Sequence, residues 1–134
     1  MKVVIDTNIW VSFLIGNHLD GLLEIINRED VRIITCETLF LELETVLKRP
    51  KLEKYITEED RSFIFEYLLR TTLQVETFGK IDVCRDRNDN FILEAAANGQ
   101  ADYIVTGDHD LLVLNLFQGI RIIPYSDFRS ISVK

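Results

Sequence analysis

Hydrophobic positions along the chain alternate between short apolar runs and longer segments with helical spacing. Short runs rich in β-branched residues predict buried strands at 2–6, 31–35, 103–106 and 120–123. The segments between them carry apolar residues at every third or fourth position, which is typical of amphipathic helices. We therefore expect an α/β protein with three layers, α/β/α, around a central, mainly parallel sheet of about four to five strands.

Residues that favour helix ends bound the helical segments. Thr57 can cap the longest of them, and the acids that follow it favour a helix N-terminus. Pro50 follows a periodic segment, as a stop signal does, and Asn98-Gly99 is a helix C-terminal signal. The helices that we expect cover residues 8–15, 19–28, 37–48, 58–73, 88–98 and 109–116, with a break near Gly16-Asn17.

The composition is that of an ordinary globular protein. The 134 residues, of which 47% are hydrophobic and 28% charged, are enough for a substantial core, so we expect a single domain over residues 1–134. No apolar run approaches the roughly 18 residues that span a bilayer, and the start lacks the parts of a signal peptide. We expect a cytoplasmic protein that has no membrane partner.

The net charge of −7 argues against broad nucleic-acid binding, which normally needs a basic surface. A polyanionic substrate would have to be received locally, with the help of a cation. Arg85 and Arg87 flank Asp86, and they either contact a nucleic acid or pair with that acid. The densest basic cluster either contacts phosphate or complements the end of the preceding helix. It consists of Lys48, Arg49, Lys51 and Lys54.

Acidic residues stand where the predicted strands end. Asp6 stands at the end of the first strand, and Asp108 follows the strand at 103–106. In open parallel sheets, ligands bind outside the carboxyl ends of the strands. Further acids lie on the segments that follow, so carboxylates collect at one edge of the predicted sheet. They include Glu37, Glu42, Glu44, Asp86, Asp89 and Asp110.

Helix capping alone explains each aspartate when it is taken singly. Asp6 and Asp108 precede predicted helices and belong to the favoured N-cap residues. Asp86 and Asp89 can cap and charge the first turn of the helix at 88–98. Asp89 also shares a helical face with apolar residues, so we expect it to point along the buried stripe.

The helix at 37–48 leaves a choice open. Its apolar face consists of Leu39, Leu43, Val46 and Leu47. Glu42 lies at one border of this face and Glu44 near the other, so periodicity alone does not choose between them.

Several converging carboxylates cannot all stay ionised without a counter-charge. Carboxylate oxygens are preferred ligands of Mg²⁺ and Mn²⁺, whereas zinc more often recruits His and Cys. Cys36 and Cys84 stand among apolar neighbours and are expected in the core, His109 is expected at the surface, and His18 falls in a predicted loop. A carboxylate site with one or two hard cations is suited to cutting phosphodiesters with activated water.

The chain carries four segments that read, in order, V-V-I-D-T-N, E-L-E-T-V-L-K-R-P-K, D-R-N-D-N-F-I-L-E-A-A and A-D-Y-I-V-T-G-D-H-D-L-L. In this order they resemble the PIN-domain family, metal-dependent ribonucleases that include the VapC-like toxins of bacterial and archaeal toxin–antitoxin pairs. The resemblance covers nearly the whole chain. The R-P-K around Pro50 and the D-x-x-D before the helix at 88–98 are similar to one prokaryotic branch of these toxins.

The resemblance implies residue roles. The family's principal acids, which are catalytic and hold Mg²⁺ or Mn²⁺, match Asp6, Glu42, Asp89 and Asp108. The E-L-x-x-V-L context selects Glu42 over Glu44. Asn8 and Thr106 match positions that steady the acids or the metal-bound water. Asp86 and Asp110 match further acids of this branch.

The resemblance also implies an endoribonuclease that hydrolyses RNA phosphodiester bonds and is restrained by an antitoxin protein. The helix at 58–73 carries more apolar surface than one buried face needs, which favours a homodimer, as does the family's habit. Two other functions compete. The same fold can be a catalytically inactive RNA- or protein-binding module whose acids only cap helices. A phosphatase of another doubly wound fold would want a second acid two residues after Asp6, where this chain has Asn8.

Overall fold

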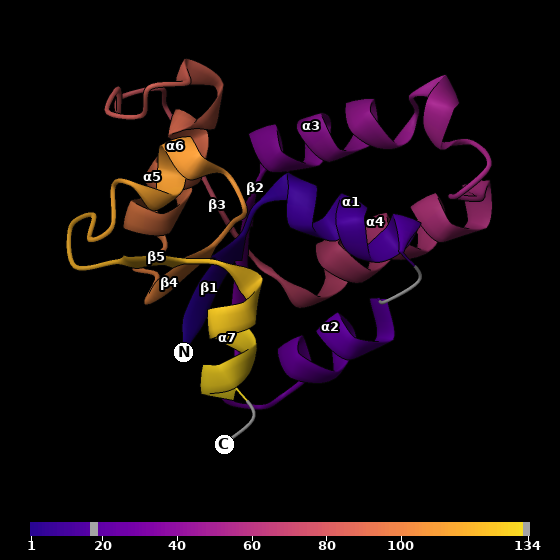
Figure 1. Ribbon diagram of the computed structural model, residues 1–134, viewed down its shortest axis with the longest axis horizontal. Helices are drawn as coiled ribbons and strands as arrows, with labels where there is room; N and C mark the ends of the chain where they lie inside the picture. Colours follow the sequence, from indigo (N-terminus) through magenta and orange to yellow (C-terminus); the bar gives the residue numbers. More distant parts are fainter. Residues whose placement is uncertain (17–18, 133–134) are drawn as a thin grey trace.

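Among the described residues, five parallel strands form one sheet in the order β3-β2-β1-β4-β5 (Figure 1). The structure is a computed structural model that describes residues 1–16 and 19–132. It confirms the predicted three-layer α/β/α architecture. The strand bounds are β1 Lys2–Ile5, β2 Arg32–Cys36, β3 Leu73–Val75, β4 Tyr103–Val105 and β5 Arg121–Ile123.

Helices cover both faces of this sheet (Figure 1). Most of them pack on one face, and α5 and α6 pack on the other. Within the described ranges, no helix is long and apolar enough to cross a membrane. The bounds are α1 Thr7–Ile15, α2 Leu19–Ile26, α3 Glu37–Leu47, α4 Glu58–Thr71, α5 Asn90–Asn98, α6 His109–Leu112 and α7 Tyr125–Ser132, with short 3-10 turns η1 Pro50–Leu52 and η2 Arg87–Asp89.

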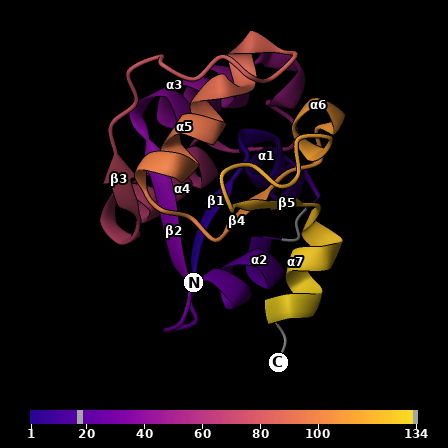
Figure 2. The same ribbon diagram turned by 90° about the vertical axis from the view of Figure 1, so that its left-hand side faces the viewer.

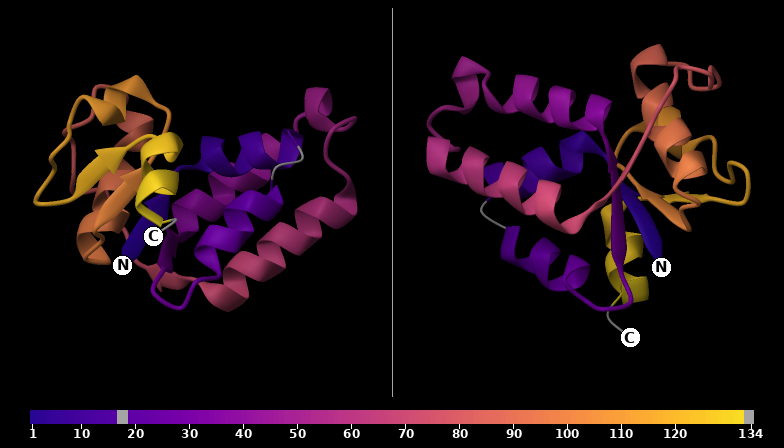
Figure 3. Two further views of the ribbon diagram at one scale, coloured as in Figure 1. Left: turned by 60° about the horizontal axis from the view of Figure 1, so that its bottom comes forward. Right: turned by 180° about the vertical axis from the view of Figure 1, so that it is seen from behind.

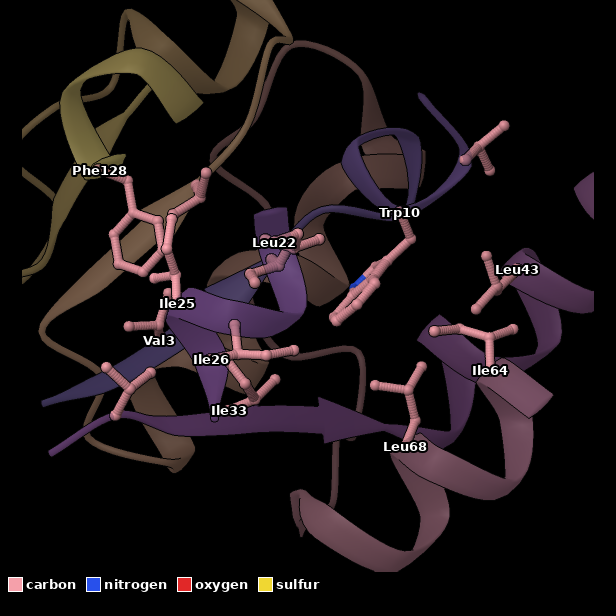
Figure 4. Close-up of a cluster of buried hydrophobic side chains, with 14 of the residues drawn as sticks. Val3, Trp10, Leu22, Ile25, Ile26, Ile33, Leu43, Ile64, Leu68 and Phe128 are labelled. Atoms are coloured by element: carbon pink, nitrogen blue, oxygen red, sulfur yellow. The ribbon is translucent and has the colours of Figure 1, made fainter. Parts of the chain in front are cut away.

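The strands are apolar at successive positions because both faces of the sheet are buried. In β1, Val3 and Ile5 enter one hydrophobic cluster, whereas Val4 between them enters the other. Trp10 of α1 is fully buried in the first cluster, among side chains of α2, α3 and α4 (Figure 4). Cys36 is buried at the end of β2 as a free thiol, in agreement with the prediction that it is a core residue.

Helices α3 and α4 lie against each other as a hairpin whose turn contains η1 (Figure 3). As predicted, Thr57 caps α4. Its hydroxyl accepts a hydrogen bond from the backbone N–H of Asp60, and the Asp60 carboxylate accepts one from the backbone N–H of Thr57. This capping box satisfies donors that would otherwise lack partners at the first turn.

The largest differences from the prediction concern two helix ends and two elements that were not predicted. The helix predicted over 58–73 ends at Thr71, and Leu73–Val75 forms the edge strand β3, which was not predicted as a strand. The helix predicted over 109–116 ends at Leu112. Helix α7 was not predicted, although Pro124 stands directly before it and the carbonyl of Pro124 accepts hydrogen bonds from the backbone N–H groups of Asp127 and Phe128. Asn17 of the predicted break and His18 lie outside the described residues.

The helix end predicted at Asn98-Gly99 is confirmed, because α5 ends at Asn98 and Gly99 is its C-cap. Gly99 has a φ of −86°, and the left-handed conformation belongs to Gln100, with a φ of 56°. A Cβ on Gly99 would lie 2.7 Å from Cδ1 of Ile34 on β2. Gly99 therefore allows α5 to end close against the sheet, and its value does not come from a positive φ.

Candidate active site at the carboxyl ends of β1 and β4

The sheet reverses its strand order next to β1. The chain runs from β1 outward to β2 and β3, and then returns to place β4 on the other side of β1 (Figures 1 and 2). Such a switch point is the usual place for a ligand in an open parallel sheet. Asp6 directly follows β1 and Thr106 directly follows β4, so both lie at this point.

The Thr106 hydroxyl links the two acids that follow these strands. Thr106 Oγ1 donates a hydrogen bond of 2.7 Å to Oδ2 of Asp6, and it accepts one of 3.0 Å from the backbone N–H of Asp108. Thr106 is fully buried and Asp6 is 2% exposed. Burial raises the pKa of Asp6, although the hydrogen bond from Thr106 works in the opposite direction.

Asp89 stands at the junction of η2 and α5 and faces the other acids. Its Oδ2 is buried without a hydrogen-bond partner among the described residues. Burial, then the neighbouring carboxyl of Asp108, then the charges of Asp6 and Asp86, raise its pKa to about 8. The prediction that Asp89 points inward agrees with this arrangement, and its carboxylate does not cap α5.

The structure separates the two glutamates that the sequence pattern left open. Glu42 is half-buried, and burial and the charges of Asp6 and Asp86 raise its pKa. Thr7 lies beside Glu42, and its buried hydroxyl oxygen has no hydrogen-bond partner within the described chain. Glu44 instead pairs with Lys48 at 2.7 Å on the outer side of α3. Glu42, and not Glu44, therefore joins the acid cluster.

Capping explains part of the cluster. The Asp86 carboxylate accepts a hydrogen bond of 3.0 Å from the backbone N–H of Asn88, and that of Asp108 accepts one of 2.9 Å from the N–H of Asp110. Asp6 makes no side-chain cap to α1. Asn8 is exposed and forms no side-chain hydrogen bond with the described residues, so its supporting role stays a prediction.

The basic residues divide into two groups. Lys48 pairs with Glu44, and Lys54 lies over the ring of Tyr55, so both lysines contact neighbouring side chains at the surface. Arg49 lies close enough to Glu42 that its positive charge lowers the pKa of that carboxyl. Arg85 and Arg87 are also exposed, and they form no ion pair with any residue that the structure describes. Pairing with Asp86 is therefore not their role here.

The structure thus brings together Asp6, Glu42, Asp89 and Asp108, with Asp86 and Thr106 beside them. In the described ranges, no three carboxylate, imidazole or thiol groups are already arranged as the ligands of one metal ion. The donor set still fits Mg²⁺ or Mn²⁺, because Mg²⁺ keeps several waters and often takes only one or two carboxylates directly. The buried oxygen of Asp89 without a partner and the raised pKa values indicate acids that a cation would stabilise.

Three residues of this region were not recognised in the sequence. Thr7 was passed over because the apolar pattern of α1 hides it, although it is fully buried. Asn90 and Glu94 were also missed, yet both are buried polar residues on α5. Their four-residue spacing inside an otherwise apolar helix is a signal that would have found them.

Comparison with known proteins gives the family. A family model described as PIN domain matches residues 2–110, and the chain belongs to this family. An uncharacterized protein of Methanocaldococcus jannaschii, MJ1680, is 34% identical over 117 residues, which cover 85% of this chain and 75% of that protein. PIN domains are generally nucleases, and they typically use divalent metals.

A solved structure has the same fold. It is a chain of the VapBC2 complex from Rickettsia felis bound to a DNA fragment from its promoter, with a TM-score of 0.59 and 16% identity. The similarity covers 91% of this chain and 97% of that chain. At this identity the likeness concerns the fold. Strand β5 and helix α7 lie beyond the residues matched by the family model, and β5 completes the sheet.

Proposed function

We propose that this PIN-domain protein is a metal-dependent endoribonuclease. The observation that carries the proposal is the convergence of Asp6, Glu42 and Asp89, three acids with raised pKa values, at the switch point of the sheet. Such a cluster is costly for a fold alone, because burial disfavours the charged form of each acid and neighbouring like charges repel each other. A cation that binds there would offset this cost.

Asp6, Glu42, Asp89 and Asp108 would hold Mg²⁺ or Mn²⁺, either directly or through water. A bound divalent cation would lower the pKa of water and stabilise charge on a phosphodiester. The Thr106 hydroxyl keeps one oxygen of Asp6 oriented by donating to it, and it fixes the backbone of Asp108. Hydrogen bonds from the backbone of Asn8 and Thr7 also lower the pKa of this carboxyl. Asp86 adds negative charge close to Asp89 and Glu42.

The experiment that tests this function is a calorimetric Mn²⁺ titration together with cleavage of a structured RNA, on wild type and Asp6→Asn. We expect saturable Mn²⁺ binding and cleavage by the wild type, and loss of both in the variant at an unchanged circular dichroism spectrum. Full cleavage by Asp6→Asn would overturn the proposal. Wild-type protein that neither binds Mn²⁺ nor cleaves RNA would do so as well.

We further propose a cytoplasmic toxin whose partner is an antitoxin protein. The similarity in fold to a chain of the VapBC2 complex from Rickettsia felis, bound to promoter DNA, supports this assignment. A second copy of the chain is also proposed as a partner, because α4 leaves Phe63 and Leu69 48% and 57% exposed. Sedimentation of the protein alone and with the product of a neighbouring small reading frame tests both partners.

A catalytically inactive binding module of the same fold is the second candidate. It is favoured by the carboxylates of Asp86 and Asp108, which already cap η2 and α6. It predicts a wild type that binds RNA or a protein but shows neither saturable Mn²⁺ binding nor RNA cleavage. The same titration and cleavage experiment therefore separates the two candidates.

A further inference from the structure

The connection between β3 and η2, residues 76–86, lacks regular secondary structure and passes from one edge of the sheet to the start of α5 (Figure 2). Side chains of α5 hold its backbone. Glu94 accepts hydrogen bonds from the backbone N–H groups of Phe78 and of Lys80, the latter at 2.7 Å. Glu94 is 4% exposed, so these contacts are made inside the protein.

Asn90 holds the next part of the same connection. Its Oδ1 accepts from the N–H groups of Val83 at 3.1 Å and of Cys84 at 2.8 Å, and its Nδ2 donates to Asp82 at 3.3 Å. Asn98 donates to the carbonyl of Glu76 at 2.7 Å. Asn90, Glu94 and Asn98 are spaced by four residues and therefore form one polar stripe on α5.

The polar stripe fixes a segment that ends at the acid cluster. The sequence after Cys84 is Arg85-Asp86-Arg87, and Asp86 lies close enough to Asp89 and Glu42 to raise the pKa of both. The thiol of Cys84 adds a weak contact of 3.6 Å to the carbonyl of Asp110 on α6. The tip of the connection is thus anchored from two helices beside the site.

The two arginines at this tip have no protein partner within the described chain. Arg85 and Arg87 are exposed and unpaired, while the Asp86 carboxylate between them is engaged by the N–H of Asn88. A chain with a net charge of −7 needs local cations to receive a polyanion. Planar guanidinium groups are well suited to bind phosphate oxygens.

We infer that residues 82–87 form a preorganised arm on which Arg85 and Arg87 bind the phosphate backbone of the RNA, and that Asn90 and Glu94 are its positioning residues. This inference rests on the proposed nuclease function. Preorganisation matters because a loop that is already ordered loses less conformational entropy when it binds. The arm explains why α5 carries buried polar groups where apolar side chains would suffice for packing.

RNA binding is measured by fluorescence anisotropy with a fluorescein-labelled structured oligoribonucleotide, in the Asp6→Asn background to prevent cleavage. We expect Arg85→Ala and Arg87→Ala each to weaken binding about tenfold, as for a lost charge-assisted hydrogen bond. Each should also reduce the salt dependence of log K by about 0.7. Arg70→Ala, which removes an equal charge from α4, is the matched control and should change neither quantity.

The positioning role has its own readouts. Asn90→Ala should speed hydrogen exchange at the amides of Val83 and Cys84 and weaken RNA binding about tenfold. In the Asn90→Ala protein, Arg85→Ala should weaken RNA binding by less than the tenfold that it causes in the parent, because the two residues act as a unit. Asn98→Ala, on the same stripe but bonded to the start of the connection, should leave RNA affinity unchanged.

Unchanged RNA affinity in both arginine variants would overturn the inference. Because Arg85 and Arg87 are exposed, their variants test it even if Asn90→Ala unfolds. Additive losses for Asn90 and Arg85 would overturn the positioning role alone. Failure of the nuclease function shows itself separately, as cleavage that survives Asp6→Asn. Absence of any RNA binding by the Asp6→Asn parent would overturn this inference alone, because cleavage by the wild type tests the nuclease function.

Discussion

Thr106 and Asp6 are one hundred positions apart, and a buried hydrogen bond of 2.7 Å joins the hydroxyl of the first to the carboxylate of the second. The bond spans the neighbouring strands β1 and β4 at the point where each ends. Because the same hydroxyl accepts from the backbone N–H of Asp108, one side chain sets the relative position of two acids. The positions of Asp6 and Asp108 are therefore fixed by the pairing of β1 with β4.

Thr106→Val should destabilise the protein by about 1–3 kcal/mol, because the isosteric change leaves a buried carboxylate and a backbone N–H without their partner. It should also raise the pKa of Asp6 further, since the lost hydrogen bond lowers that pKa. Urea unfolding and an NMR titration of the carboxyl carbon measure the two effects. Thr106→Ser keeps the hydroxyl and serves as the control. Equal behaviour of the two variants would contradict the assigned role of the hydroxyl.

Glu42→Gln should lower RNA cleavage by at least about a hundredfold, a typical loss for a group that stabilises charge at a reaction centre. Glu44→Gln is the matched control on the same helix, because Glu44 pairs with Lys48 outside the cluster. It should cost no more than about 0.5 kcal/mol of stability and leave cleavage unchanged. Comparable losses of activity in both variants would contradict the assignment of Glu42 to the site.

The stability of the metal-free protein should fall as pH rises from 3.8 to about 8, the ordinary and folded pKa values of Asp89. In this window the folded state binds more protons than the unfolded state, so the free energy of unfolding decreases with pH. The raised pKa values of Asp6 and Glu42 act in the same direction. Thermal melts in EDTA across this range measure the effect.

Two comparisons check the cause of this pH dependence. Asp89→Asn should be more stable than the wild type at the alkaline end, because the amide resembles the protonated acid. Mn²⁺ at about a hundredfold above its Kd should stabilise the wild type by about 2.7 kcal/mol. Stability that is independent of pH in EDTA would show that neither burial nor repulsion raises the pKa values of these acids in the folded protein.

The sheet and the acids at its edge were predictable because each has a local pattern. Buried parallel strands read as apolar runs, and Asp6 and Asp108 stand at the ends of two such runs. Strand β3 escaped prediction because Leu73 continues the apolar periodicity of α4, although the chain leaves the helix at Thr71. Only the pairing of β3 with β2 in the folded sheet shows where the strand begins.

The details of the site depend on contacts between distant residues, which periodicity cannot reveal. Both Glu42 and Glu44 lie at borders of the apolar face of α3, and the neighbours from other elements distinguish them. Glu42 meets Thr7 and the charge of Asp6, whereas Glu44 meets Lys48. The same holds for Asn90 on α5, whose backbone partners come from an irregular connection.

Gly99→Ala should destabilise the protein by about 1–3 kcal/mol, the usual cost of forcing an extra methyl group into a packed interior. Its Cβ would lie 2.7 Å from Cδ1 and 3.0 Å from Cγ2 of the fully buried Ile34, and 3.1 Å from the carbonyl oxygen of Ala95. Gly21→Ala is the control, since Gly21 lies in helix α2 and a Cβ there meets nothing within 4 Å. It should stabilise the protein by about 0.5–1 kcal/mol, because alanine loses less backbone entropy in a helix. Urea unfolding measures the change in the free energy of unfolding for both variants. A decrease for Gly99→Ala with an increase for Gly21→Ala would mean that close packing holds the end of α5 against β2. No change for Gly99→Ala would contradict this.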